Sequence, residues 1–339
     1  MKNIILPFIA FFFLISCNSQ TSSKDEQKKS DSLTGANTSV SSQVPVIDHN
    51  KDTSAGYDHI PMVNENPSSN LPGAVKNRKE ELFKTITFKG KGAEERREGI
   101  RLASKGDLKG AIDMFTRSIE IHAKNPDAYF YRGKAKWESK DYAGAEADFS
   151  KAIEIRPTQA PYYYYRGTFY MDRRQFDKAI SDFDSTIRRV PSYHDAINYK
   201  GVALANLGKH QEAIAVYDQV INMQPGFALA YYNKGTSLAA LEKYAEAEEV
   251  LSQAITNNPG YEQAYVNRGN ARLMQNKFQP AWDDYSMALS LNPKNVDALY
   301  NSGFALLQLN MKDRACENWQ KASALGHKLS QQQIGKYCK

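Results

Sequence analysis

Cysteine and tryptophan are scarce in this sequence. Of its 339 residues only three are Cys and three are Trp. Three thiols cannot build a disulfide-dense scaffold or a four-thiolate zinc site within one chain. The 44 Lys and Arg exceed the 38 Asp and Glu by a formal +6, an excess too small by itself to indicate a nucleic-acid partner. The apolar run from Ile4 to Ile15 is shorter than the roughly 20 residues that a membrane-spanning helix needs.

Motifs for catalysis and metal binding are also missing. No two of the six His share a metal-ligand spacing on one helix face. The chain has no G-x-S-x-G elbow, and no Cys has a His partner that the sequence pattern would bring near it. We therefore expect no catalytic residue, no metal and no cofactor, and a protein that is not an enzyme.

The N-terminal residues have the pattern of an export signal. Lys2 precedes the apolar run, and polar residues follow it directly. The boundary Leu14-Ile15-Ser16-Cys17 resembles the lipobox of bacterial lipoproteins, in which cleavage before the Cys leaves a thiol that carries a diacylglycerol. This resemblance implies a signal peptide over residues 1–16 and a lipid on Cys17. The alternative is an ordinary secretory signal with an incidental Cys.

A polar tether is expected after the lipid. Residues 17–91 are rich in Ser, Thr, Asn, Lys and Pro and have no sustained helical or alternating period, a composition that cannot bury enough apolar surface to offset its ordering entropy. Asn18 differs from the Asp that retains many lipoproteins in the inner membrane, so an exported, lipid-anchored protein of the outer membrane is favoured. The periplasmic and surface faces both remain open.

The remaining chain repeats one unit seven times. A Gly recurs at every thirty-fourth residue, and an Ala follows each Gly after twelve residues. The Gly ladder is Gly99, Gly133, Gly167, Gly201, Gly235, Gly269 and Gly303, and the Ala ladder is Ala111, Ala145, Ala179, Ala213, Ala247, Ala281 and Ala315. Four residues after each Ala stands a large apolar or aromatic residue, one helical turn along the same face.

This spacing predicts stacked helical hairpins. Gly inside a helix costs about 0.5–1 kcal/mol relative to Ala, so seven in one phase need a packing reason. Small residues at both ladders let two antiparallel helices approach closely. A Pro near the end of units two to six, from Pro157 to Pro293, breaks the chain before the next unit. Each hairpin has two apolar faces and needs neighbours to bury them.

The pattern resembles the tetratricopeptide repeat family, whose unit is W-x2-L-G-x2-Y, A-x3-F and P over 34 residues. The fullest match is Tyr163, Gly167 and Tyr170, followed by Ala179 and Phe183. Tyr often replaces the family's Trp, and Arg or Lys its Leu. The resemblance covers residues 92–329 and implies an all-α protein: a right-handed α-α superhelix of about seven hairpins. Residues 330–339 are predicted to form a C-terminal capping helix.

In arrays of this family, one stripe of each first helix lines a concave groove. By that resemblance the groove here carries aromatic residues interleaved with Asn, which suit an extended peptide because an Asn can bond a backbone amide on both sides. The candidate partner-binding residues are Phe130, Tyr131, Lys134, Tyr164, Tyr165, Thr168, Asn198, Tyr199, Tyr232, Asn233, Asn267, Asn270, Tyr300 and Asn301. The alternative for any one of them is a solvated or neighbour-packing side chain.

The expected function follows from this groove. The chain is interpreted as a non-enzymatic scaffold that binds other envelope proteins, with their identity and its own oligomeric state left open. A glycan-binding surface lipoprotein that stacks sugars on the Tyr residues is the alternative. Nucleic acid is not expected, because the groove lacks a stripe of Lys or Arg.

Two thiols remain after lipidation of Cys17. Cys316 and Cys338 would both lie in an oxidising compartment, and we expect them to form a disulfide that pins the capping helix to the last repeat. Two small buried thiols are the alternative.

Overall fold

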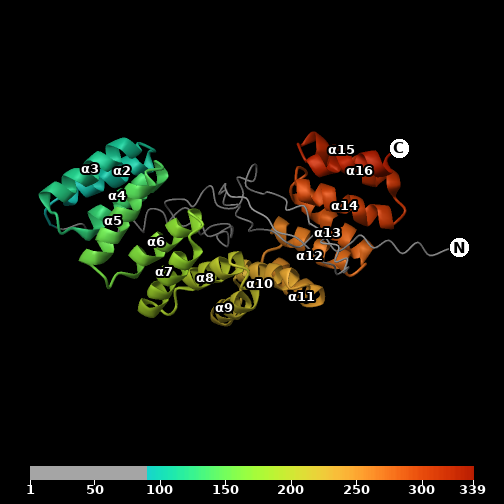
Figure 1. Cartoon of the computed structure of the whole chain (residues 1–339), viewed down its shortest axis with the longest axis horizontal. Helices are drawn as coiled ribbons and strands as arrows, with labels where there is room; N and C mark the ends of the chain where they lie inside the picture. The colour runs from blue at the N-terminus through green and yellow to red at the C-terminus, as the bar shows by residue number, and fades with distance from the viewer. Residues whose placement is uncertain (1–89) are drawn as a thin grey trace, which may run out of the picture.

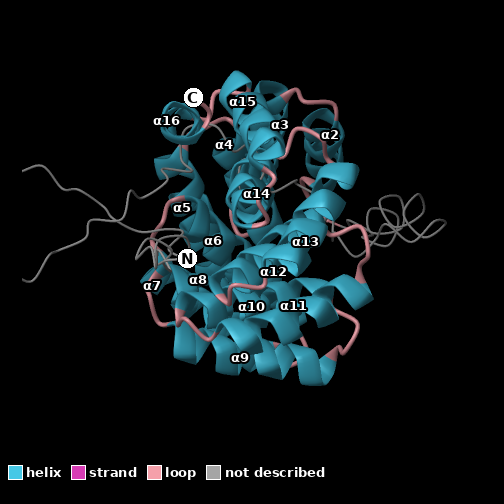
Figure 2. Cartoon of the chain, turned by 90° about the vertical axis from the view of Figure 1, so that its right-hand side faces the viewer, coloured by secondary structure: helices cyan, strands magenta, loops and turns pink. Residues whose placement is uncertain are grey.

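The computed structural model describes residues 90–339. This part of the chain is built of helices joined by short loops and contains no strand (Figure 2). Consecutive helices pair into seven antiparallel hairpins. The first helices of the hairpins are α2 (Ala93–Ser104), α4 (Pro126–Glu138), α6 (Ala160–Asp172), α8 (His194–Asn206), α10 (Ala228–Ala240), α12 (Glu262–Met274) and α14 (Val296–Gln308).

The second helices run antiparallel to the first and complete each hairpin. They are α3 (Leu108–Ile121), α5 (Tyr142–Ile155), α7 (Phe176–Arg189), α9 (His210–Met223), α11 (Tyr244–Asn257), α13 (Phe278–Leu291) and α15 (Lys312–Ala324). A final helix, α16 (Lys328–Tyr337), follows a turn at Gly326 and packs on α15. The fold predicted from the repeat, an α-α superhelix of seven hairpins with a terminal helix, is confirmed.

The hairpins stack along a curved array (Figure 1). Hairpin α2–α3 lies at one end, α15 and α16 lie at the other, and α9 lies near the bottom of the arc. First helices of neighbouring hairpins contact one another at α6–α8, α8–α10, α10–α12 and α12–α14. The first helices therefore form the inner, concave row, and second helices such as α9 and α11 lie on its outer side.

The Gly and Ala ladders explain the tight hairpins. Every Ala of the Ala ladder is fully buried. A Cβ added to Gly99 would lie 2.6 Å from the Phe115 ring, and one on Gly269 would lie 2.8 Å from the Tyr285 ring. The ring of the second helix therefore fills the space that a side chain on the Gly would need. Those rings are themselves buried and belong to apolar clusters that span neighbouring hairpins, such as the one that contains Phe149 and Phe183.

The turn inside each hairpin depends on one left-handed residue. These residues have φ between 56° and 83° and recur at steps of 34: Gly106, Lys140, Arg174, Gly208, Glu242, Asn276 and Asn310. At the second turn the Asp141 amide donates to the Lys136 carbonyl at 2.8 Å, and the Lys140 amide donates to the Trp137 carbonyl at 2.9 Å. This pair of bonds is a Schellman closure, which stabilises a conformation that is otherwise unfavourable for a residue with a side chain.

Candidate functional site

The predicted groove residues all lie on the inner row of helices. They come from α4, α6, α8, α10, α12 and α14, one group on each hairpin. The fourteen candidates therefore follow the concave side of the array from its second to its seventh hairpin (Figure 1). Cys17, the predicted lipidation site, lies outside the described residues.

Burial divides these candidates into two sets. Eight of them have little exposed surface and pack inside the array: Phe130, Lys134, Tyr164, Thr168, Asn198, Asn267, Tyr300 and Asn301. Six are half-buried and keep some surface for a partner: Tyr131, Tyr165, Tyr199, Tyr232, Asn233 and Asn270. Most of the first set joins neighbouring hairpins. Phe130, Tyr164 and Asn198 contact the next first helix, and the amides of Asn267 and Asn301 contact the preceding one.

One position of the first helix changes its chemistry halfway along the array. At steps of 34 residues it carries three tyrosines, Tyr131, Tyr165 and Tyr199, and then three asparagines, Asn233, Asn267 and Asn301. We call this series the inner column. The inner column thus has an aromatic half on hairpins two to four and an amide half on hairpins five to seven.

The side chains in the amide half of the inner column donate hydrogen bonds to the preceding hairpin. The Asn233 amide donates to Asn198 Oδ1 at 3.1 Å, and the Asn267 amide donates to Thr236 Oγ1 at 3.1 Å. The Asn301 amide donates to Asn270 Oδ1 at 2.9 Å. Each of these three side chains thus ties its helix to the preceding first helix, which limits the donors it can offer to a peptide.

The aromatic half contains a buried lysine among rings. Lys134 is 7% exposed, and its ammonium lies 4.1 Å from the ring centre of Tyr165 and 5.6 Å from that of Phe130. Burial lowers the pKa of Lys134 to about 8, opposed by the charge of Glu138. Burial also raises the pKa of Tyr131 to about 12. The two rings stabilise the charged form of Lys134, whereas its burial favours the neutral form, so the lysine is a buried cation whose pKa is well below that of an exposed lysine.

Three first helices carry an Arg in the slot that the family usually fills with Leu: Arg132, Arg166 and Arg268. Arg166 donates to both carboxylate oxygens of Asp182 at 2.8 Å and to Ser150 Oγ of the preceding hairpin at 3.0 Å. Arg132 and Arg268 make the same contacts, to Asp148 and Thr116 and to Asp284 and Ser252. Each Arg therefore joins the second helices of two consecutive hairpins. The sequence showed the substitution of Leu but not this bridging role.

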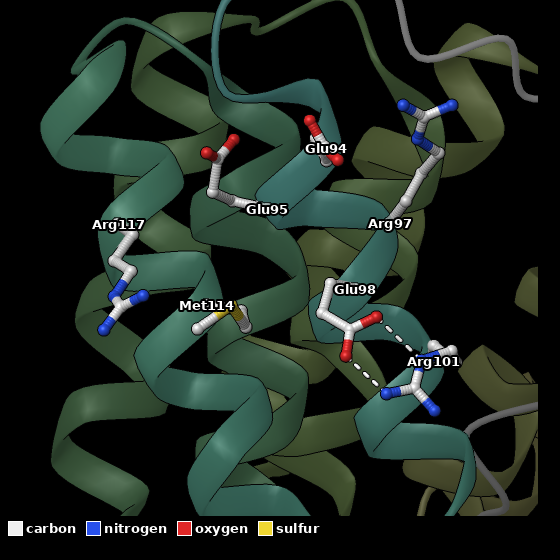
Figure 3. A pocket seen from close by; sticks show the side chains of 7 residues that line it. All are labelled: Glu94, Glu95, Arg97, Glu98, Arg101, Met114 and Arg117. Atoms are coloured by element: carbon white, nitrogen blue, oxygen red, sulfur yellow. Dashed lines mark hydrogen bonds and ion pairs between the residues drawn. The ribbon is translucent and has the colours of Figure 1, made fainter.

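An open hollow of about 470 Å³ lies on the first hairpin (Figure 3). Its lining comes from α2 and α3 and comprises Glu94, Glu95, Arg97, Glu98, Arg101, Met114 and Arg117. Glu98 and Arg101 form an ion pair across one side of it. Three carboxylates and three guanidinium groups balance in charge, and no His, Cys or Ser lines the hollow.

Over residues 90–339 the structure holds no group of His, Cys, Asp and Glu that could bind a metal ion. Among the helices that the structure describes, none combines the length and the apolar composition required to cross a bilayer.

The two remaining thiols are joined at the end of the array. The Cys316 sulfur on α15 is bonded to the Cys338 sulfur just after α16. The terminal helix packs its Leu329, Ile334 and Tyr337 side chains against the core that includes buried Trp319. The Tyr337 ring stacks on Trp319 with ring centres 5.6 Å apart. Helix α16 thus covers the apolar face of the last hairpin and is held there covalently.

Comparison with known families agrees with this architecture. The tetratricopeptide repeat model matches residues 96–160, 166–228 and 232–295, and a second tetratricopeptide repeat model matches residues 297–324. The chain belongs to the tetratricopeptide repeat family. The fold of this family generally supports scaffolds for protein–protein interaction. No curated protein is similar enough to count as a match.

Solved structures share the fold at low sequence identity. A tetratricopeptide repeat protein from Parabacteroides merdae is 16% identical with a TM-score of 0.58, over 74% of this chain and 99% of that one. The C-terminal part of a tetratricopeptide repeat protein from Cytophaga hutchinsonii is 19% identical with a TM-score of 0.57, over 68% and 95%. PilF from Pseudomonas aeruginosa is 16% identical with a TM-score of 0.54, over 62% and 96%. At these identities the similarity concerns the fold alone.

Proposed function

We propose that this protein is a non-enzymatic adaptor of the bacterial cell envelope, which binds segments of partner proteins along the concave row of its first helices. The observation that carries the proposal is the aromatic half of the inner column. Tyr131, Tyr165 and Tyr199 stand on three consecutive hairpins and are half-buried. Partly exposed, well-supported tyrosines are suited to protein interfaces because they offer a large contact area at low conformational cost.

The surroundings of these tyrosines hold them in place before a partner arrives. The Tyr131 ring stacks on Phe115 with ring centres 5.9 Å apart, and the Tyr199 ring stacks on Phe183 at the same distance. The Tyr165 ring lies edge-on to Phe130 at 5.2 Å. Each ring therefore rests on a residue of the core. Preformed contact surfaces reduce the entropy lost on binding.

Attachment to the membrane through Cys17 is part of the same proposal. Its support is the lipobox-like Leu14-Ile15-Ser16-Cys17 at the end of the apolar run. A lipid at Cys17 would attach the array to the membrane through the polar segment 18–91. Mass spectrometry of the N-terminal peptide should show a diacylglyceryl group on Cys17, absent in Cys17→Ser.

Site-specific photocrosslinking tests the binding surface. A photoreactive phenylalanine analogue replaces Tyr199 on the inner row or, as a matched control, Gln211, which is exposed on α9 of the outer row. The proposal expects reproducible protein adducts in cells from the Tyr199 position and few from the Gln211 position. Adducts that form only at Gln211, or at neither position, would contradict it.

The glycan-binding alternative gives a different result in the same experiment. The half-buried tyrosines could also stack on sugar rings, so adducts from Tyr199 are digested separately with protease and with cell-wall hydrolase. Peptides of a second protein in the protease digest, found by mass spectrometry, support the adaptor function. A size shift of the intact adduct on hydrolase treatment, with no second protein in the digest, supports glycan binding.

A further inference from the structure

Four tyrosines converge where α6 meets α8. Tyr164 and Tyr165 lie on α6, Tyr193 immediately precedes α8, and Tyr199 lies on α8. The ring centre of Tyr164 is 4.9 Å from that of Tyr193, 5.4 Å from that of Tyr165 and 6.1 Å from that of Tyr199. Tyr164 is only 4% exposed, whereas the other three rings are half-buried. Tyr164 is therefore the buried centre of a cluster whose outer rings keep accessible surface.

A carboxylate accompanies these rings. Asp195 lies in the first turn of α8, four residues before Tyr199 and therefore on the same face of the helix, and its side chain is 20% exposed. Burial is the main cause that raises the pKa of Tyr165 and of Tyr199, and the negative charge of Asp195 is the next. The same charge contributes to the raised pKa of Tyr164 and of Tyr193. The charge of Asp195 thus acts on all four tyrosines, which stay neutral at physiological pH.

Other titratable groups beside the cluster come from its neighbours. The His194 Nε2 lies 3.7 Å from the Asp195 carboxylate and carries charge only when protonated. On the opposite side of α6 in the row, the Lys134 ammonium from α4 lies over the Tyr165 ring. The cluster therefore has a positive charge on its α4 side and a negative charge on its α8 side.

The face of an aromatic ring attracts a cation, and a nearby carboxylate strengthens that attraction. This chain already uses the contact elsewhere: Arg173 lies 4.0 Å from the ring centre of Tyr142, and Arg189 lies 4.0 Å from that of Tyr163. From this geometry we propose a cation-binding subsite, built of Tyr165, Tyr193, Tyr199 and Asp195, for an Arg or Lys side chain of the partner segment. The inference rests on the proposed function, since it assumes that a partner segment enters the concave side.

The charge distribution selects a basic residue over an acidic one. An incoming carboxylate would be repelled by Asp195 and by the negative ring faces. A guanidinium group fits especially well, because it can stack on a ring and bond both oxygens of a carboxylate. Lys134 restricts the incoming cation to the α8 side of Tyr165. The subsite therefore also fixes where along the array the basic residue must lie.

A random peptide library displayed on phage and selected on the full chain tests the subsite. Peptides selected by the natural chain should be enriched in Arg or Lys relative to the starting library. Asp195→Asn should lose the enrichment, and Glu212→Gln, which removes an exposed carboxylate from the outer helix α9, should keep it. The affinity of a selected peptide, followed by fluorescence anisotropy, should fall about tenfold in Asp195→Asn and should weaken as salt is added.

A second pair of variants examines the rings without changing charge. Tyr199→Phe keeps the ring and should bind as the natural chain does, whereas Tyr199→Leu should bind more weakly. Selected peptides without basic enrichment, an unchanged selection by Asp195→Asn, or affinity that is independent of salt would each overturn the cation site and leave peptide binding intact. If the natural chain selects no peptide above background, the proposed function falls together with the inference.

Discussion

Gly201 and Tyr217 occupy one shared space between α8 and α9: a Cβ on Gly201 would lie 2.5 Å from Cε1 of Tyr217. Tyr217 is 1% exposed, so its ring has little room to move away. The same relation recurs along the array, for example between Gly167 and Phe183, where the corresponding distance is 2.9 Å. The Gly ladder is therefore required by the large buried side chains of the second helices, which are rings in six hairpins and Leu251 in the fifth.

Gly201→Ala should destabilise the array although Ala is the better helix former. The added methyl group must displace the buried Tyr217 ring, and overpacking of this kind costs about 1–3 kcal/mol. Denaturant unfolding followed by circular dichroism measures the effect. Gly335→Ala is the matched control, because no atom lies within 4 Å of the added Cβ in α16, and it should be neutral or stabilising by about 0.5–1 kcal/mol. Equal effects of the two substitutions would contradict the packing role.

Arg166→Leu should be strongly destabilising even though Leu is the family's usual residue in that slot. The substitution leaves Asp182, which is 4% exposed, buried without its guanidinium partner. Removing one member of a buried pair costs about 3–5 kcal/mol. Burial already raises the pKa of Asp182, and the bonds from Arg166 oppose that rise.

The double variant Arg166→Leu with Asp182→Leu provides the control for this pair. With both charges gone, stability should return to within about 1–2 kcal/mol of the natural chain or exceed it. Thermal and denaturant unfolding of the two single variants and the double variant give the coupling energy. If the two single effects simply add, Arg166 and Asp182 do not act as a pair.

Lys134 should make stability depend on pH. Burial lowers its pKa to about 8 in the folded chain, against 10.5 for an ordinary lysine, so the unfolded chain binds more protons between these values. Stability contributed by this group therefore rises with pH across that window and is lost as pH falls through about 8. Between pH 7 and 9.5 the difference in unfolding free energy between the natural chain and Lys134→Met should change by roughly 2 kcal/mol, in favour of the natural chain.

Comparing the two chains cancels the titration of other groups. The buried tyrosines act in the opposite direction and above this window, because an unfolded Tyr loses its proton near pH 10, whereas burial raises the pKa of Tyr131 to about 12. Urea unfolding at several pH values provides the measurement. A difference that stays constant from pH 7 to 9.5 would show that Lys134 keeps its ordinary pKa.

Breaking the Cys316–Cys338 bond should loosen the end of the array. The bond spans 22 residues of sequence, and the chain-entropy model assigns such a loop about 3 kcal/mol. Reductant should therefore lower the unfolding midpoint of the natural chain and accelerate hydrogen exchange in α16. The variant with Cys316→Ser and Cys338→Ser should already show both effects and should not respond to reductant. A natural chain that is insensitive to reductant would exclude a stabilising bond.

The sequence predicted the fold well because the repeat acts through local rules. Gly133, Ala145 and Phe149 mark one hairpin, and their recurrence at steps of 34 residues fixes the helix pairing of the whole array. Pro157 and its equivalents mark where each hairpin ends. The Schellman turns were not foreseen, because residues as different as Lys140 and Asn276 adopt the same left-handed conformation.

The candidate site was only partly predictable. Its helices and its concave side follow from the repeat, but exposure depends on neighbours that a linear pattern does not show. Tyr164 was a candidate contact residue and lies at the centre of a buried aromatic cluster. Asn301 was a candidate as well, and its amide bonds Asn270 on the preceding hairpin. Tyr193 and Asp195 were not candidates, although they lie beside Tyr164 and Tyr199 in the structure.

The sequence by itself determined the repeating unit, the number of hairpins and the residues that face the inner row, because periodicity and steric size act over a few helical turns. Only the tertiary structure decided which inner residues remain accessible and which are bonded to the next hairpin. That division depends on contacts between helices that are 34 residues apart, where Asn233 meets Asn198 and Lys134 meets Tyr165.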